Sequence, residues 1–319
     1  MTTLQAQATA LFEEQKTGWP LLGSNWNLLK EVRVKEFRFD DVVIRLQFNP
    51  KRIVSSAARV DRDSIEKRAC FLCPQHRPAE EKSVWFGRDY EIMCNPFPIF
   101  QQHFTIARRE HTPQVIRPEF PAFLELSSAL PQLVVFYNAP ACGASAPDHM
   151  HFQAGNRGMM PIENDLEHLQ RRYGQGLVRR ERLKVTAISD GLRRFFRLES
   201  ASREALGDAC NLIFDVMQAY QGQEPLLNLL LYADRSWNLL LFPREKHRPW
   251  QYFEEGERNI LLSPAAVDMG GTLIIPMEKD FLSITKEDIR DIFAQVTCSE
   301  EHFQQLSRQI QTKLNGHGT

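Results

Sequence analysis

The most informative segment of the sequence runs from Asn138 to Gln153 and reads NAPACGASAPDHMHFQ. Its last five residues alternate, because His149, His151 and Gln153 are polar whereas the Met and Phe between them are apolar. Successive side chains of a β-strand point to opposite faces of the sheet. The pattern therefore predicts a strand with two imidazoles and a carboxamide in one row and two apolar side chains buried behind them.

A loop of small residues, CGASAP at positions 142–147, lies just before this strand. The backbone N–H groups of such residues can approach an anion closely. A row of imidazoles beside such a loop suits nucleophilic attack on a phosphate ester. Two other interpretations are a half-buried strand with hydrogen-bonded histidines and a two-histidine metal site. The small-residue loop favours the catalytic interpretation.

The composition limits the class of protein. The chain has 319 residues, enough for two ordinary domains or one large duplicated one. Hydrophobic residues make up 43% and charged residues 25%, as is usual for a soluble globular protein. The net charge of −1 and the lack of any block of five like charges give no sign of a nucleic-acid or membrane surface. We therefore expect small-molecule partners, and the sequence leaves the oligomeric state open.

The sequence also bears on the compartment. The first residues lack the basic start and apolar core of a signal peptide, and no apolar run reaches membrane-spanning length. Six cysteines in a chain of this length do not indicate a disulfide framework. We therefore expect a cytoplasmic protein in a reducing environment.

Apolar periodicity predicts an α+β protein. Helices are expected at 1–15, 121–130, 203–220, 285–296 and 299–314, and residues 154–182 are expected to form a polar loop region. Strands are expected at 31–39, 42–48, 52–60, 90–94, 103–108, 132–137, 183–188, 195–198, 226–232, 237–242, 259–262 and 272–275.

A short internal similarity suggests a duplication. Residues 106–113 read IARREHTP and residues 241–249 read LFPREKHRP, and each half then runs on to a glycine-bearing loop, at Gly143 and at Gly270. We therefore predict two related halves, a catalytic half over 1–182 and a degenerate half over 183–319 that lacks the His-x-His-x-Gln pattern. Basic residues at the two strand exits are candidates for binding phosphate, namely Arg108, Arg109, Arg244, Lys246 and His247.

These residues resemble the histidine-triad superfamily, in its nucleotidyltransferase and phosphorylase branch. That branch includes galactose-1-phosphate uridylyltransferase, diadenosine tetraphosphate phosphorylase and GDP-L-galactose phosphorylase. The run HMHFQA at 149–154 looks most like the last of these, whereas residues 225–300 look like the C-terminal part of diadenosine tetraphosphate phosphorylases. The resemblance implies a duplicated unit of antiparallel sheets with flanking helices.

The resemblance also implies roles for individual residues. His151 would be the nucleophile that forms a nucleotidyl-histidine, with its second ring nitrogen donating to the carbonyl of His149. Gln153 would donate to a phosphate oxygen. The Gly143–Ser145 loop would stabilise the developing charge through N–H groups. Asn138 would hold the nucleotide phosphates or the motif loop. Asn95 and Phe97 match a segment facing the nucleoside, although Asn-Pro-Phe-Pro also suits a plain strand-ending turn.

A second group of residues resembles a metal site. Cys70 and Cys73 form a Cys-x-x-Cys pair, and with His111 and His149 they match the residues that bind a structural zinc in the uridylyltransferases. Two cysteines and two histidines are an ordinary tetrahedral zinc set. Diadenosine tetraphosphate phosphorylases generally do without this metal, so the alternative is a pair of cysteines with no metal role.

The expected reaction is phosphorolysis of a nucleoside-diphosphate sugar or of a dinucleoside polyphosphate, with phosphate or a sugar phosphate as acceptor. The HFQA run favours the first substrate class, and the chain length and C-terminal half favour the second. One alternative is a hydrolase of the same superfamily, although hydrolase members usually carry a third histidine where Gln153 stands. The other is a nucleotide-binding module without catalysis.

Overall fold

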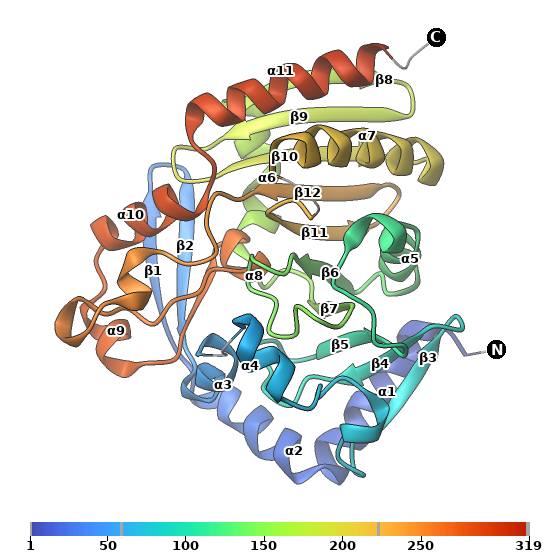
Figure 1. The fold of residues 1–319 in the computed structure, drawn as a ribbon, viewed down its shortest axis with the longest axis vertical. Helices are drawn as coiled ribbons and strands as arrows, with labels where there is room; N and C mark the ends of the chain where they lie inside the picture. Colours follow the sequence, from blue (N-terminus) through green and yellow to red (C-terminus); the bar gives the residue numbers. More distant parts are fainter. Residues whose placement is uncertain (1, 58–59, 222–223, 317–319) are drawn as a thin grey trace.

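A ten-stranded antiparallel sheet organises the computed structural model, which describes residues 2–57, 60–221 and 224–316 (Figure 1). The strands follow the order β3-β4-β5-β7-β6-β11-β12-β10-β9-β8. Their bounds are β3 Ser83–Phe86, β4 Tyr90–Cys94, β5 His103–Arg108, β6 Leu133–Asn138, β7 His151–Asn156, β8 Gly174–Arg180, β9 Leu183–Ser189, β10 Arg194–Ser200, β11 Leu227–Ala233 and β12 Trp237–Pro243.

The two halves of this sheet share one topology. If the strands of each half are numbered in chain order, both halves read 1-2-3-5-4 across the sheet. A long helix joins the third strand to the fourth in each half, α5 (Ile116–Ala129) in the first and α7 (Arg203–Gln221) in the second. The two fourth strands, β6 and β11, pair with each other at the centre. The predicted α+β duplication is therefore confirmed.

The short sequence similarity, however, aligns strands that are not equivalent. Residues 106–108 lie in β5, the third strand of its half, whereas residues 241–243 lie in β12, the fifth strand of the other half. The topological counterpart of β12 is β7, which carries the histidine pattern. Both segments are strand exits, so they share the polar and proline residues that end strands. That shared chemistry, rather than the duplication, explains the similarity.

The hairpin of β8 and β9 lies at the start of the second half. Arg180 pairs with Leu183 at its turn, so the division predicted after residue 182 falls inside this hairpin. By topology β8 is the first strand of the second half. The expected loop region before it contains helix α6 (Pro161–Tyr173), in which Pro161 stands at the first position and Glu163 accepts from the N–H of Met160.

Helices cover one face of the large sheet and a smaller sheet covers part of the other. The first face packs on α1 (Leu4–Gly18), α5, α7 and α11 (Glu300–Gly316) in a single hydrophobic core. On the second face lies a three-stranded sheet in the order β1-β2-β13, in which β2 and β13 run parallel. Its bounds are β1 Arg33–Phe39, β2 Val42–Phe48 and β13 Thr272–Ile275.

Short helices complete the fold around these sheets. They are α2 Pro20–Asn27, α3 Ile53–Ser56, α4 Arg62–Lys67, α8 Ala266–Met269, α9 Glu278–Ser283 and α10 Lys286–Val296, with 3₁₀ turns at Leu28–Glu31, Pro50–Arg52, Pro74–His76, Trp250–Phe253 and Gly256–Arg258. Within residues 2–57, 60–221 and 224–316, no helix combines the length and the apolar composition of a membrane span.

Two strands predicted from the sequence were wrong. Residues 50–56 form a 3₁₀ turn and helix α3 instead of a strand, with Pro50 at the start, where its fixed φ favours a helical turn. The predicted strand continued to residue 60, but residues 58–59 lie outside the described part of the chain. Residues 259–262 form no strand, and Leu262 donates to the nearby carbonyl of Ile260, as in a tight turn.

Aromatic packing on the helix-covered face of the sheet holds strand β7 in place. The ring of Phe152 stacks on Phe123 and on Tyr90, with centroids 5.0 and 5.6 Å apart. Phe152 and Met150 belong to the helix-covered core. Because side chains alternate along a strand, His151 and Gln153 point to the opposite face.

Candidate functional site

A cavity of about 870 Å³ lies on the second face of the large sheet, and residues from both halves line it. From the second half these include Ser263, Ala265 and Asp268. Among the residues predicted from the sequence, those that line the cavity are Asn95, Phe97, Asn138, Gly143, Ser145, His151, Gln153 and His247. The imidazole of His149 lies elsewhere, in the cysteine cluster described below.

His151 stands at the start of β7 with only 3% of its surface exposed. Its Nδ1 lies 2.8 Å from the main-chain carbonyl oxygen of His149. A carbonyl can only accept, so Nδ1 carries the proton and Nε2 keeps its lone pair. Burial lowers the pKa of His151 to about 4, which favours the neutral ring. The arrangement gives a neutral imidazole with one defined nucleophilic nitrogen.

Gln114 holds His151 in place, and no sequence pattern identified it. Its fully buried side chain accepts from the N–H of His151 at 2.8 Å and donates to the carbonyl of the same residue at 2.9 Å. It also donates to the carbonyl of Asn138 at 3.1 Å. One amide therefore ties the beginning of β7 to the end of β6. A single glutamine in a loop offers no periodic signal that points to this role.

The side chain of Asn95 shapes a turn in the cavity wall. Its Oδ1 accepts from the N–H of Phe97 at 3.0 Å and its Nδ2 donates to Oγ1 of Thr105 at 3.2 Å. This is the hydrogen-bond pattern of an Asx turn. The segment thus forms the strand-ending turn that the sequence left open, and it also lines the cavity.

The loop around Gly143 presents unused N–H groups. Gly143 has a φ of +99°, a conformation that other residues rarely adopt. In the part of the chain that the structure describes, the N–H groups of Gly143, Ala144 and Ser145 have no hydrogen-bond partner. Arg68 steadies the loop by donating to the carbonyl of Ser145 at 3.3 Å and to Asp148 at 2.8 Å. Such N–H groups can bind an oxyanion.

Asn138 connects this site to the second half. Its Oδ1 accepts from the N–H of Ala266 and from Nδ2 of Asn228, each at 2.8 Å. Asn228 is fully buried and belongs to β11, the strand that pairs with β6. The second half therefore fixes a cavity residue of the first, although it lacks the histidine pattern itself.

Positive charge predominates along the cavity wall. Arginine and lysine side chains outnumber carboxylates there, with Arg52, Lys67, Arg68 and Arg248 against Glu81 and Asp268. Burial lowers the pKa of Arg52 to about 10, which still leaves it protonated at neutral pH. Burial also raises the pKa of Asp268 to about 6, so a small fraction of this carboxyl is protonated at neutral pH. The balance favours an anionic ligand.

The basic candidates at the strand exits behave differently from one another. His247 lines the cavity, and so does its neighbour Arg248, which was not predicted from the sequence. Arg108 pairs with Glu119, and Arg109 lies over the ring of Trp85. Arg244 is fully buried and donates to the carbonyls of Val296 and Pro264, among others. Arg244 does not line the cavity, because a strand exit can also turn into the core.

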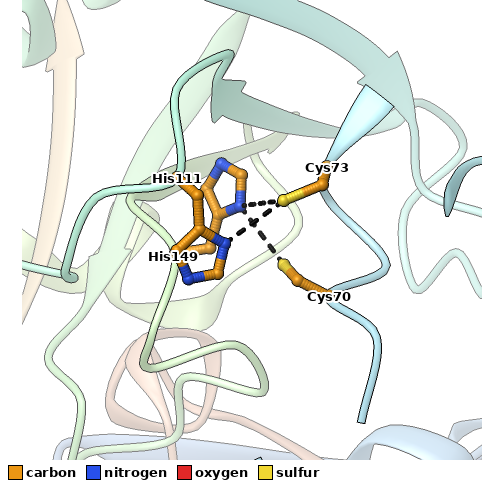
Figure 2. A group of neighbouring side chains, drawn as sticks. All are labelled: Cys70, Cys73, His111 and His149. Atoms are coloured by element: carbon orange, nitrogen blue, oxygen red, sulfur yellow. Dashed lines mark hydrogen bonds between the residues drawn. The ribbon is translucent and has the colours of Figure 1, made fainter. Parts of the chain in front are cut away.

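Cys70, Cys73, His111 and His149 form one cluster, with ligand atoms that all lie within 4.8 Å of one another (Figure 2). Nδ1 of His149 lies 3.2 Å from Sγ of Cys70 and 3.5 Å from Sγ of Cys73. Nδ1 of His111 lies 3.2 Å from Sγ of Cys73. The group can hold a metal ion.

The chemistry of this donor set fits zinc. Nε2 of His149 donates to the carbonyl of Arg108 at 2.6 Å, so Nδ1 presents its lone pair to the sulfurs. Tetrahedral zinc with ordinary bond lengths separates nitrogen and sulfur ligands by about 3.5 Å, close to the observed 3.2 to 3.5 Å. Burial raises the pKa of Cys70 to about 11, so a cation must displace a proton to bind there.

Two protein families each match a little less than half of the chain. Residues 175–316 match the family described as the GDPGP1-like C-terminal domain. Residues 11–156 match a domain of unknown function, DUF4922. No curated protein sequence is significantly similar to the chain.

Solved structures of a yeast enzyme share the fold. Yeast Ap4A phosphorylase Apa2 in complex with AMP is 14% identical, with a TM-score of 0.55 over 87% of this chain and 94% of the yeast chain. The same enzyme in complex with Ap4A is 14% identical, with a TM-score of 0.56 over 89% and 97% of the two chains. At this identity the likeness concerns the fold.

Proposed function

We propose that the chain is a nucleotide phosphorylase that works through a covalent nucleotidyl-histidine at His151. The observation that carries the proposal is the 2.8 Å hydrogen bond from Nδ1 of His151 to the carbonyl of His149 at the wall of the 870 Å³ cavity. It leaves Nε2 as the nucleophile. The N–H groups of the Gly143–Ser145 loop and the cationic wall suit the phosphates of the substrate.

The reaction has two displacements. In the first, Nε2 of His151 attacks the α-phosphorus of the substrate, and the bond from that phosphorus to the bridging oxygen breaks. The leaving group departs as a sugar phosphate or as a nucleotide, and it keeps the electron pair. In the second, an oxygen of inorganic phosphate attacks the same phosphorus and Nε2 is released. The product is a nucleoside diphosphate, and the accepting phosphate becomes its β-phosphate.

The remaining cavity residues bind and orient the substrate. Gln153 and Asn138 donate from their amide groups to oxygens of the transferred phosphoryl group. Asn95 and Phe97 form the wall that faces the nucleoside, and the Phe97 ring offers a surface for a base. The basic side chains Arg68 and Arg248 and the imidazole of His247 lie where they can receive the leaving or accepting phosphate.

Zinc is the metal we propose for the cluster of Cys70, Cys73, His111 and His149. When bound, it would cross-link the Cys-x-x-Cys segment to His149, which lies just before the catalytic strand. His149 would then hold its own carbonyl at a constant position for Nδ1 of His151. The proposed role is structural.

Two substrate classes fit the proposal, and one assay separates them. The GDPGP1-like match supports a nucleoside-diphosphate sugar, and the likeness to an Ap4A phosphorylase bound to Ap4A supports a dinucleoside polyphosphate. Purified protein is incubated with members of both classes, with and without inorganic phosphate, and the products are separated by chromatography. We expect a nucleoside diphosphate that appears only when phosphate is present.

The same assay tests the hydrolase alternative. A hydrolase would release a nucleoside monophosphate at the same rate with or without inorganic phosphate. That result would make the protein a hydrolase rather than a phosphorylase. If the protein converts no member of either substrate class, the proposed function is wrong.

A further inference from the structure

Two side chains in the cavity wall, Asn138 and Gln153, end in carboxamides whose orientation decides their chemistry. A carboxamide can present either its NH₂ group or its oxygen to a ligand, and the two orientations have nearly the same shape. The NH₂ group attracts a phosphate oxygen, whereas the carbonyl oxygen repels it. The protein therefore needs a means of choosing the orientation.

We propose that His103, Asn228 and Arg244 are positioning residues that lock the carboxamides of Gln153 and Asn138 with their NH₂ groups toward the cavity. We call the residues that orient Gln153 the first lock and those that orient Asn138 the second lock. Each lock begins with a group that can only donate a hydrogen bond. The inference rests on the proposed function, because it assigns these donors to the phosphoryl group that His151 receives.

The first lock begins at a main-chain N–H group. The N–H of Ile99 donates to Nδ1 of His103 at 3.4 Å, so this nitrogen must carry a lone pair. The proton of the neutral ring is then on Nε2, which lies 3.0 Å from Oε1 of Gln153. The oxygen of Gln153 thus faces His103, and its NH₂ group is left for the cavity that Gln153 lines.

The environment of His103 keeps the ring in this state. Its side chain is fully buried, and burial together with the positive charge of Arg52 lowers its pKa to about 3. A protonated ring would place a second N–H against the N–H of Ile99. The rings of Phe100 and Phe136 lie 5.3 and 6.1 Å from the imidazole and restrict its rotation.

The second lock begins at Arg244, whose guanidinium has no acceptor atom. It donates to Oδ1 of Asn228, which turns the NH₂ group of Asn228 outward. That group donates to Oδ1 of Asn138 and to the carbonyl of Cys142, each at 2.8 Å. The N–H of Ala266 donates to the same Oδ1. Two donors therefore hold the oxygen of Asn138 away from the cavity.

The second lock also gives the second half of the chain, which lacks the His-x-His-x-Gln pattern, a function in catalysis. Asn228, Arg244 and Ala266 all belong to that half, and they reach the first half through Asn138. The catalytic half alone would leave the orientation of Asn138 undefined.

A double-mutant cycle tests the first lock. The variants are His103→Phe, Gln153→Met and the two combined, and kcat/KM of the phosphorolysis is measured for each. His103→Phe keeps a ring of similar size but removes the donor, so kcat/KM should fall about 10- to 100-fold. In the Gln153→Met background the same change should have an effect of less than about threefold. Equal effects in both backgrounds would overturn the role of His103.

A second cycle tests the lock from the other half. Asn228→Asp keeps the shape and the acceptor for Arg244 but places an oxygen against Oδ1 of Asn138. We expect kcat/KM to fall about 10- to 100-fold, mostly through kcat, and much less in an Asn138→Ala background. Asn238→Asp is the matched control, because buried Asn238 also accepts from an arginine, Arg197, at 2.9 Å and does not line the cavity. An equal loss in the control would overturn the second lock.

A tautomer measurement separates failure of the locks from failure of the proposed function. Nitrogen NMR of histidine-labelled protein, with His103→Phe to assign the signal, reports which ring nitrogen carries the proton. We expect the Nε2–H form of His103 throughout pH 5 to 8. The Nδ1–H form would overturn the first lock even in an active enzyme. If the wild-type protein lacks phosphorolysis, the proposed function fails, whatever the tautomer.

Discussion

Gly143 of the first half and Ala265 of the second half are in direct contact: a Cβ atom at position 143 would lie 2.5 Å from Cβ of Ala265. The close approach lets the small-residue loop and the second half form one continuous cavity wall. A glycine is required for two reasons, since its φ of +99° is also unfavourable for other residues.

Gly143→Ala should therefore destabilise the protein by about 2 to 4 kcal/mol, the sum of left-handed backbone strain and an overpacked contact. Gly158→Ala is the matched control, because Gly158 has a φ of +77° but a methyl group at this position would have no atom within 4 Å. It should lose only about 1 kcal/mol. Urea unfolding of both variants measures the difference, and equal losses would show that the contact with Ala265 is not tight.

Removal of the metal should destabilise the chain. We expect about one zinc per chain by elemental analysis, and Cys73→Ser should lower both the zinc content and Tm because it removes one of four ligands. Cys94→Ala is the control. Cys94 is buried outside the cluster, so this variant should retain the metal. A metal-free wild-type protein with an unchanged Tm after chelation would contradict the zinc site.

His247 should make the protein sensitive to acid. Burial, together with the charges of Arg248 and Arg244, lowers the pKa of His247 to about 4. An unfolded histidine titrates near 6.5, so between these values only the unfolded chain takes up the proton. The stability that this residue contributes is full above pH 6.5 and is lost as the pH falls toward 4.

His247→Gln cannot titrate, so its free energy of unfolding should decline less between pH 7 and pH 4, by up to about 3 kcal/mol relative to the wild type. Denaturant unfolding at several pH values measures the two slopes. Parallel curves for the two proteins would mean that His247 does not remain neutral in the fold.

Local patterns in the sequence were sufficient for much of the fold. The alternation around His151 predicted that Phe152 is buried and that His151 points to the opposite face, where the cavity lies. The strands predicted at 226–232 and 237–242 correspond to β11 and β12, which pair with each other. Helix α6 was not predicted, although Ile162, Leu166 and Leu169 recur at helical spacing and are buried. The other residues of α6 are mostly polar, so residues 154–182 were interpreted as a loop region.

Other features depend on contacts distant in the chain. Nothing local in Thr272–Ile275 indicates that β13 pairs in parallel with β2, because parallel partners have no turn between them. The same is true of the candidate site. The cysteine and histidine cluster was expected from the family resemblance, whereas His103, Gln114 and Asn228 act through hydrogen bonds that only the folded chain creates.

The covalent nucleotidyl-histidine proposed at His151 can be trapped and located in the chain. Wild-type protein is mixed with an α-³²P-labelled substrate without inorganic phosphate, denatured in alkali and digested. We expect label on the peptide that contains His151, stable in alkali and lost in acid, as for a phosphoramidate.

His151→Ala should take up no label and should lose at least about 1,000-fold in turnover. Exposed His168 serves as the control, so His168→Ala should label like the wild type. Label that persists in His151→Ala, or an active wild-type protein whose label lies on another residue, would rule out His151 as the nucleophile.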